Sequence, residues 1–137
     1  MQKNIKLSIL TPEKVFFNGE VSQIVTQTPE GEMGIMAGHM PSIAVVSDSL
    51  LKVEENGTWR SAALGQGIMD VSAAGIEFFV DTAEWDKDID VPRSEKALHR
   101  AEDRLHSGNL SHVEFVRTHT AIARATARLK TAHSRKH

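Results

Sequence analysis

The sequence changes its periodicity within residues 76–106, which read IEFFVDTAEWDKDIDVPRSEKALHRAEDRLH. At the start of this stretch, apolar side chains occupy every second position, as at Ile76, Phe78 and Val80, which is typical of a half-buried β-strand. From Asp90 onward, apolar residues recur at helical spacing instead. The stretch therefore marks a boundary between a β-rich part and a helical part of the chain.

Charge divides the chain at the same boundary, although the net charge of the whole chain is only −2. Residues 1–92 contain 6 Lys and Arg against 14 Asp and Glu, which gives −8, whereas residues 93–137 contain 10 against 4, which gives +6. Such a split indicates two parts with different partners. We expect a β-sandwich unit at residues 1–88 and a helical unit at residues 89–137.

Composition excludes several classes of protein. A chain of 137 residues is long enough for one core with a small appendage, and too short for two full domains. The absence of cysteine removes disulfides, thiolate nucleophiles and cysteine zinc sites, and it fits a reducing compartment. The sequence lacks phosphate-loop, serine-hydrolase and zinc-protease motifs, and no apolar run reaches the roughly 20 residues of a membrane span. We therefore expect a soluble, intracellular chain without a catalytic or metal site.

Before the boundary, short β-rich runs alternate with turn residues. The expected strands are Ile5–Ile9, Val15–Phe17, Val21–Thr28, Ile43–Val46, Leu50–Glu54, Thr58–Leu64, Ile68–Ser72 and Ile76–Val80. The expected turns are Asn18-Gly19, Asn56-Gly57, Gly65-Gln66-Gly67 and Ala73-Ala74-Gly75. Many short strands without helices between them predict an antiparallel β-sandwich or barrel. The expected fold class is mainly β plus α, with this sandwich followed by a C-terminal two-helix hairpin.

The helical part carries its own start and stop signals. In chain order these are an N-cap at Asp90 with Pro92 in the first turn, a stop at Gly108-Asn109, and a Ser-x-x-Glu capping box at Ser111 and Glu114. They predict one helix to about His106 and a second to about Ala132. Because so short a hairpin buries little area, we expect it to be only marginally stable by itself.

Arginine recurs at equivalent positions of the two helices. The triplets are Arg93, Arg100 and Arg104 in the first helix, and Arg117, Arg124 and Arg128 in the second. At about 100° per residue, each triplet occupies one edge of its helix, away from the apolar stripe. Such edges bind phosphate oxygens or carboxylate-rich partners, or are simply solvated. A basic-tailed adaptor that binds nucleic acid is the alternative, although Phe115 is the single aromatic residue of this part and offers no stacking platform.

One segment of the β-rich part, residues 28–41, combines three glycines, two prolines and His39. Long loops of this kind often carry function, although a structural corner explains the composition equally well. Residues 30–41, EGEMGIMAGHMP, resemble the signature E-G-E-x-G-I-x-x-G-H-x-P of the epsilon subunit of F-type ATP synthases. Residues 65–71, GQGIMDV, and 80–83, VDTA, are similar to the family's G-G-x-x-E-V and A-D-T-A.

The resemblance covers essentially the whole chain and implies a non-catalytic rotor subunit of the central stalk, which couples proton translocation to ATP synthesis. The implied partners are the gamma subunit, the c-ring, and the alpha and beta subunits, with no nucleic acid and with membrane contact only through the complex. Carried over by position, Glu32 faces the c-ring, and Gly38, His39, Met40 and Pro41 lie near the gamma contact. The implied location is the cytoplasmic face of the bacterial plasma membrane, with the plastid thylakoid as the alternative.

The resemblance also implies a regulatory role for the hairpin, which in this family inhibits ATP hydrolysis when it extends into the catalytic head. Arg117, Arg124 and Arg128 then contact acidic segments of beta. In its folded form, the hairpin of some bacterial members binds ATP through an I/L-D-x-x-R-A motif, which reads IDVPRS at residues 89–94 here. No cofactor is required, and regulatory ATP is the implied ligand. Its implied binding residues are Glu84, Asp90, Arg93, Arg100, Arg124 and Arg128.

Overall fold

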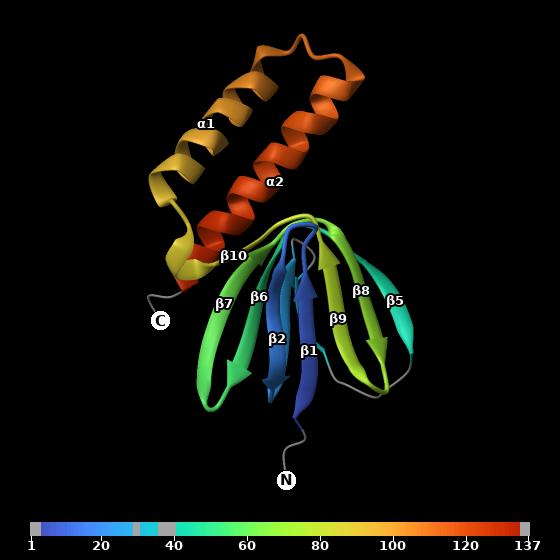
Figure 1. Ribbon diagram of the computed structural model, residues 1–137. Coiled ribbons are helices and arrows are strands. Elements are labelled where there is room, and N and C mark those ends of the chain that lie inside the picture. The colour runs from blue at the N-terminus through green and yellow to red at the C-terminus, as the bar shows by residue number, and fades with distance from the viewer. Residues whose placement is uncertain (1–3, 29–30, 36–40, 135–137) are drawn as a thin grey trace.

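The computed structural model describes residues 4–28, 31–35 and 41–134, which form a β-sandwich with a helical hairpin at one end (Figure 1). The strands are β1 (Ile5–Leu10), β2 (Val15–Val21), β3 (Gln23–Thr28), β4 (Gly31–Ile35), β5 (Ser42–Val46), β6 (Ser49–Glu55), β7 (Thr58–Leu64), β8 (Gly67–Ser72), β9 (Gly75–Val80) and β10 (Ala83–Trp85). Sheet A has the strand order β2-β1-β9-β8-β5, and sheet B has the order β10-β7-β6-β3-β4. The prediction of a β-sandwich followed by two helices is confirmed.

Strand direction departs from the prediction in one pair. The strands β1 and β9 of sheet A run parallel, whereas the other neighbouring strands are antiparallel. The predicted antiparallel sandwich therefore has one parallel pair of strands. Alternating apolar residues report which face of a strand is buried, and they carry no information about the direction of its neighbour.

The core lies between the two sheets and is built from alternate residues of the strands. In β1, Ile5, Leu7 and Ile9 are buried, and Phe78 of β9 lies opposite Ile9 with none of its surface exposed. Leu51 of β6 belongs to the same cluster from the side of sheet B. The period-two pattern therefore identifies the buried face correctly.

Two of the expected turns connect the strands as predicted. Asn56 and Gly57 have φ angles of 52° and 80° and form the two-residue connection between β6 and β7. Both residues of a type I′ hairpin turn need positive φ, which Asn and Gly tolerate. Ala73 and Ala74 connect β8 to β9, where Gly75 has a φ of 143°.

The other two expected turns were wrong. Asn18 and Gly19 lie inside β2, opposite Ser8 and Leu7, and a Cβ at Gly19 would lie 3.3 Å from the ring of Phe17. Glycine thus leaves room for an aromatic ring here, instead of turning the chain. Residues 65–67 do not form a hairpin, because they lead from β7 in sheet B to β8 in sheet A.

The helical boundaries follow the predicted signals. Helix α1 (Val91–Ser107) begins after Asp90, whose side chain accepts a hydrogen bond from the backbone N–H of Arg93 at 3.1 Å. It ends at Gly108, which has a φ of 81°. Helix α2 (His112–Ser134) begins after Ser111 and ends two residues later than predicted.

The hairpin stands on one end of the sandwich, and α2 is the helix that lies against β6 and β7 (Figure 1). A small apolar cluster lies at this junction and consists of Ala63 of β7, Ala132 of α2, and Ile89, which precedes α1. The chain reaches α1 through β10 and a short 3-10 helix, η1 (Asp86–Asp88), neither of which was predicted. A short strand of this kind is fixed by pairing, here of β10 with β7, and not by periodicity.

Candidate functional site

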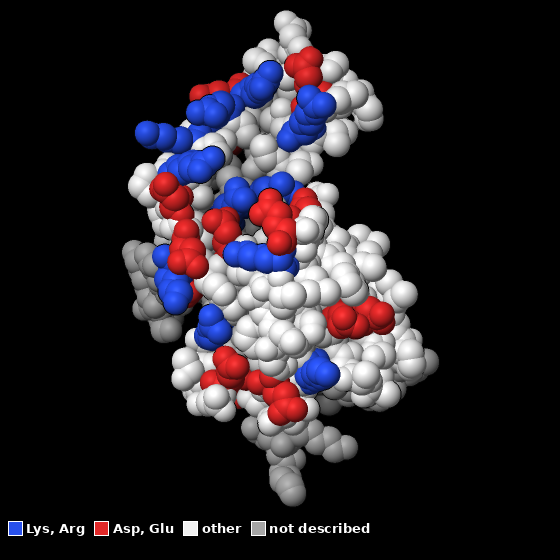
Figure 2. Space-filling view, in the orientation of Figure 1, with Lys and Arg blue, Asp and Glu red and all other residues white. Residues whose placement is uncertain are grey.

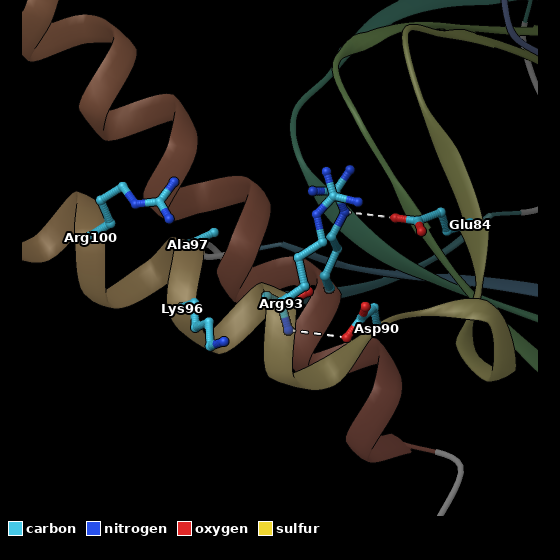
Figure 3. A pocket seen from close by; sticks show the side chains of 8 residues that line it. Glu84, Asp90, Arg93, Lys96, Ala97 and Arg100 are labelled. Carbon is cyan, nitrogen blue, oxygen red and sulfur yellow. Dashed lines mark hydrogen bonds and ion pairs between the residues drawn. The ribbon is translucent and has the colours of Figure 1, made fainter.

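A pocket opens where the beginning of α1 faces β10. We call it the proximal pocket; its cavity measures about 430 Å3 and is lined by Glu84, Asp90, Arg93, Ser94, Lys96, Ala97, Arg100 and Arg128. Figure 3 shows Glu84 on the sandwich side, and Arg93 and Arg100 along α1. The pocket therefore lies between the two units of the chain.

Positive charge is in excess in the proximal pocket. Four of its side chains are cationic and two are carboxylates. Both carboxylates are engaged, since the Nε of Arg128 donates to Glu84 at 2.7 Å and Asp90 caps α1. Figure 2 shows the resulting mixture of blue and red side chains in the hollow between hairpin and sandwich. Arg93, Lys96 and Arg100 make no ion pair within the described ranges, so their charge is available to an anion.

Arg124 lies outside this pocket and joins α2 to the sandwich. Its Nε donates to Asp48 Oδ1 at 3.2 Å, and its Nη2 donates to Asp81 Oδ2 at 2.7 Å. The Asp48 side chain is only 2% exposed, and the other carboxylate oxygen accepts from Gln66 Nε2 at 3.4 Å. Burial lowers the pKa of the Arg124 guanidinium, but the hydrogen bonds and charges of Asp48 and Asp81 outweigh burial and raise its pKa above the ordinary value.

The structure brings together five of the six residues that the sequence suggested for ATP. Glu84, Asp90, Arg93, Arg100 and Arg128 line the proximal pocket. The sixth, Arg124, contacts the sandwich carboxylates instead. Sequence reasoning missed Lys96, although it lies one turn before Arg100 on α1. It also missed Asp48, because an aspartate between two strands has the appearance of an ordinary turn residue.

The remaining suggested residues lie elsewhere. Arg117 is exposed on α2, away from the sandwich carboxylates. Glu32 is exposed on β4, where its carboxylate accepts from Gln27 Nε2 at 2.6 Å, and Pro41 is exposed just before β5. The suggested Gly38, His39 and Met40 lie outside the described residues.

A row of apolar side chains crosses the outer face of sheet A, and sequence reasoning missed it. We call it the sheet A row; in the order of the paired strands it comprises Val45, Ile68, Phe79, Leu10 and Val15. All except the half-buried Leu10 are exposed, and Val45 is 88% exposed. Figure 2 shows a largely uncharged area over this sheet. An apolar row of this extent on a face without a covering layer is typical of a protein–protein contact.

Polar residues border the sheet A row. The next outward-facing row begins with Ile43, which is apolar and exposed, and continues through the polar residues Asp70, Glu77, Ser8 and Asn18, which lie opposite one another in the paired strands. An apolar centre with a polar rim is the usual arrangement of an interface. The individual strands show only alternation, so the row becomes visible when the registers of five strands are known.

The fold and these sites define a class: a β-sandwich whose C-terminal helical hairpin carries an arginine-rich pocket at the junction. Residues 4–86 match the family model for the β-sandwich domain of the ATP synthase delta/epsilon chain, and residues 87–133 match the model for its long α-helix domain. The chain belongs to the delta/epsilon chain family of ATP synthases, which confirms the resemblance carried by residues 30–41. Members of this family are non-catalytic subunits, so the chain is not itself an enzyme.

Several relatives are similar along nearly the whole chain. The ATP synthase epsilon chain of Ruminiclostridium cellulolyticum is 37% identical over 130 residues, which are 95% of this chain and 96% of the relative. That of Clostridium acetobutylicum is 42% identical over 110 residues, 80% of this chain and 83% of the relative.

No described helix combines the length and apolar character that crossing a membrane requires.

Solved structures share the same fold. A chain in the cryo-EM structure of the Euglena gracilis mitochondrial ATP synthase, OSCP/F1/c-ring in rotational state 1, has a TM-score of 0.77 and 25% identity, with 95% of this chain and 81% of that chain covered. A chain of the central stalk/c-ring structure from Tetrahymena thermophila has a TM-score of 0.63, with 96% and 98% covered, and at 17% identity it supports the fold alone.

Proposed function

We propose that the chain is the central-stalk epsilon subunit of an ATP synthase, which couples rotation to ATP synthesis and restrains ATP hydrolysis. The observation that carries this proposal is the match to both family domains in their order along the chain. Residues 1–88 anchor the subunit to the gamma subunit and the c-ring, and residues 89–137 regulate ATP hydrolysis. The subunit is peripheral and reaches the membrane only through the complex, on the cytoplasmic face in a bacterial cell.

The sheet A row is the surface that contacts gamma. Val45 and Ile68 lie opposite each other and are too exposed to contribute much to the fold, so their apolar character needs another explanation. Glu32 and Pro41, together with residues 38–40, contact the c-ring and the adjoining part of gamma. Burial of large side chains at the centre of an interface supplies most of its binding free energy.

Co-purification of the full chain with gamma tests this surface. Val45→Glu is expected to weaken the complex by about tenfold or more, because it introduces a charge into an apolar contact. Trp59→Glu is the matched control, since Trp59 is 46% exposed but belongs to sheet B. Equal retention of gamma by both variants would contradict the proposed contact.

The proximal pocket binds ATP while the hairpin lies against the sandwich. Its cavity of about 430 Å3 is within the range of small-molecule sites, roughly 300–1,000 Å3. Arg93, Arg100 and Arg128 provide guanidinium groups for the phosphates, whereas Glu84 and Asp90 accept hydrogen bonds from the sugar or base. ATP then connects α1 to β10 and α2, and so stabilises the folded hairpin.

Calorimetric titration of the full chain with ATP tests this site. We expect saturable binding that Arg93→Gln weakens by about tenfold, the loss of one charge-assisted contact. Lys130→Gln removes the same charge from an exposed position of α2 outside the pocket and is expected to change affinity by less than about twofold. An absence of heat at millimolar ATP would overturn the ATP site and leave the rotor function intact.

When the hairpin leaves the sandwich, Arg117, Arg124 and Arg128 contact acidic segments of beta and inhibit hydrolysis. Arg117 tests this role best, because it makes no ion pair to the described part of the sandwich and its loss breaks none of the junction contacts of the folded hairpin. In the reconstituted complex, Arg117→Glu is expected to raise the rate of ATP hydrolysis, and Lys130→Glu is the charge-matched control. A rate that is equal in the two variants would contradict a specific contact of Arg117 with beta.

A further inference from the structure

A second cavity lies between α1 and α2, further from the sandwich than the proximal pocket. We call it the distal groove; it measures about 250 Å3. Ala97, Ala101 and Thr118 form its floor, where small side chains let the two helices approach closely. Arg100 and Arg104 of α1 and Arg117 of α2 lie around it. Figure 2 shows this arm of the molecule bearing a line of blue side chains.

The arginines of the distal groove are not neutralised by the protein. Within the described ranges, none of Arg100, Arg104 and Arg117 makes an ion pair, whereas Arg124 and Arg128 further along α2 are paired with sandwich carboxylates. The groove has one carboxylate, Glu114, and that group is engaged by the hydroxyl of Ser111 at 3.2 Å.

Three cations around one carboxylate repel one another, and this repulsion destabilises the hairpin unless an anion occupies the groove. The arrangement also suits a particular kind of anion. Guanidinium groups from two helices can each present two N–H donors to oxygens of the same ligand, which favours phosphate over a monovalent anion.

We propose that the distal groove binds a compact oligophosphate, of which inorganic pyrophosphate is the simplest example. The cavity of about 250 Å3 is below the roughly 300–1,000 Å3 of typical small-molecule pockets, so it accommodates a phosphate group without a nucleoside. Arg104 and Arg117 line the distal groove and do not line the proximal pocket, whereas Arg100 lines both. The phosphate comes either from free pyrophosphate or from the phosphate end of a nucleotide whose base lies in the proximal pocket.

Titration of the full chain with sodium pyrophosphate, free of magnesium, tests the groove. Calorimetry is expected to show saturable binding with a dissociation constant of about 1 mM or lower. Arg104→Gln and Arg117→Gln, neither of which lines the proximal pocket, are each expected to weaken it by about five- to tenfold. Lys130→Gln is the matched control and is expected to change affinity by less than about twofold. Circular dichroism verifies that the variants stay helical, since all three substituted side chains are exposed.

Amide NMR signals locate the bound phosphate. Signals of Ala101 and Thr118 are expected to shift on addition of pyrophosphate. A second titration, on protein saturated with ATP, separates the two sources of phosphate. If one further equivalent of pyrophosphate binds, the ligand of the groove is a free oligophosphate. If pyrophosphate no longer binds and ATP itself shifts the signals of Ala101 and Thr118, the groove holds the phosphates of the nucleotide.

Three results would overturn the proposal: no saturable binding, an equal loss in Lys130→Gln, or no shift at Ala101 and Thr118 with either ligand. Pyrophosphate binding in the absence of any ATP binding would refute the proximal ATP site alone.

Discussion

The sandwich and the hairpin are held together by different kinds of contact. The sandwich buries large apolar side chains, such as Leu7 and Phe78, with none of their surface exposed. The most buried residues of α2 are small, namely Ala125, Thr131 and Ala132. Burying a large apolar side chain stabilises a fold by about 1.5–3 kcal/mol, and alanine contributes far less. The hairpin therefore depends on a few ion pairs for its position, and the sandwich on its core.

This difference suits the two roles that we propose for the units. A unit that anchors the subunit to a rotor must not open, and its free energy of unfolding is spread over many buried side chains. A regulatory unit must detach and return, and its docking must involve a free energy small enough for a ligand or partner to reverse. Contacts through small residues and polar pairs satisfy that requirement.

Truncating the centre of the core is expected to have the largest effect. Phe78→Ala should lower the free energy of unfolding of the sandwich by about 3–5 kcal/mol, because the cavity cannot collapse between two sheets. Urea denaturation followed by tryptophan fluorescence measures this. Phe79→Ala is the matched control one residue along, and since Phe79 is 40% exposed its effect should stay below about 1 kcal/mol.

A smaller effect is expected at the junction, from Arg124→Gln. The change leaves Asp48, which is 2% exposed, without its cation, and the Arg124 side chain itself is 28% exposed, so screening reduces the effect. We expect docking of the hairpin to weaken by about 1–2 kcal/mol, seen as faster amide exchange in α2 and unchanged exchange in the core of the sandwich. Arg117→Gln is the control, since Arg117 has no partner among the described residues of the sandwich, and equal exchange in both variants would contradict the junction's dependence on Arg124.

The sign of the Arg124 pKa shift adds a pH dependence. Because the folded-state pKa is raised above the unfolded one, the contribution of Arg124 is complete below the unfolded pKa and is lost only as the pH rises through the still higher folded value. Titration of Arg124 itself should therefore not alter α2 amide protection, corrected for intrinsic exchange, between about pH 6 and pH 9. Loss of protection in that range in wild type but not in Arg124→Gln would refute this.

Sequence reasoning succeeded where the signal is local. Alternation identified the buried face of β1, the caps located both helices, and three arginines of the predicted helix edges line one pocket. It failed where the outcome depends on distant pairing. Arg124 and Asp48 are 76 residues apart and meet only because α2 lies on the sandwich. The sheet A row likewise depends on the registers of five strands.

The two Asn-Gly dipeptides show the limit of a local signal, and they allow a further prediction. Gly57→Ala should cost about 1–2 kcal/mol, because Gly57 has a φ of 80° that alanine adopts poorly. Gly19→Ala should cost less, since Gly19 lies within a strand and the nearest group to a Cβ there is the ring of Phe17, at 3.3 Å. Thermal unfolding of the two variants measures the difference, and a larger loss at Gly19 would show that the Phe17 ring cannot move.

The smallest effect is expected at the start of α2, from Ser111→Ala. The hydroxyl of Ser111 accepts from the backbone N–H of Glu114 at 3.2 Å, so the change leaves one donor of the first turn uncapped. We expect a loss of about 0.5–1 kcal/mol, confined to amide exchange in the first turn of α2, and Ser111→Asp should restore the cap. If the hairpin and the sandwich are held by separate contacts, the unfolding midpoint of the sandwich stays the same. A shift of that midpoint would mean that the two units unfold as one, and that the ion pairs at the junction transmit more free energy than their number and exposure suggest.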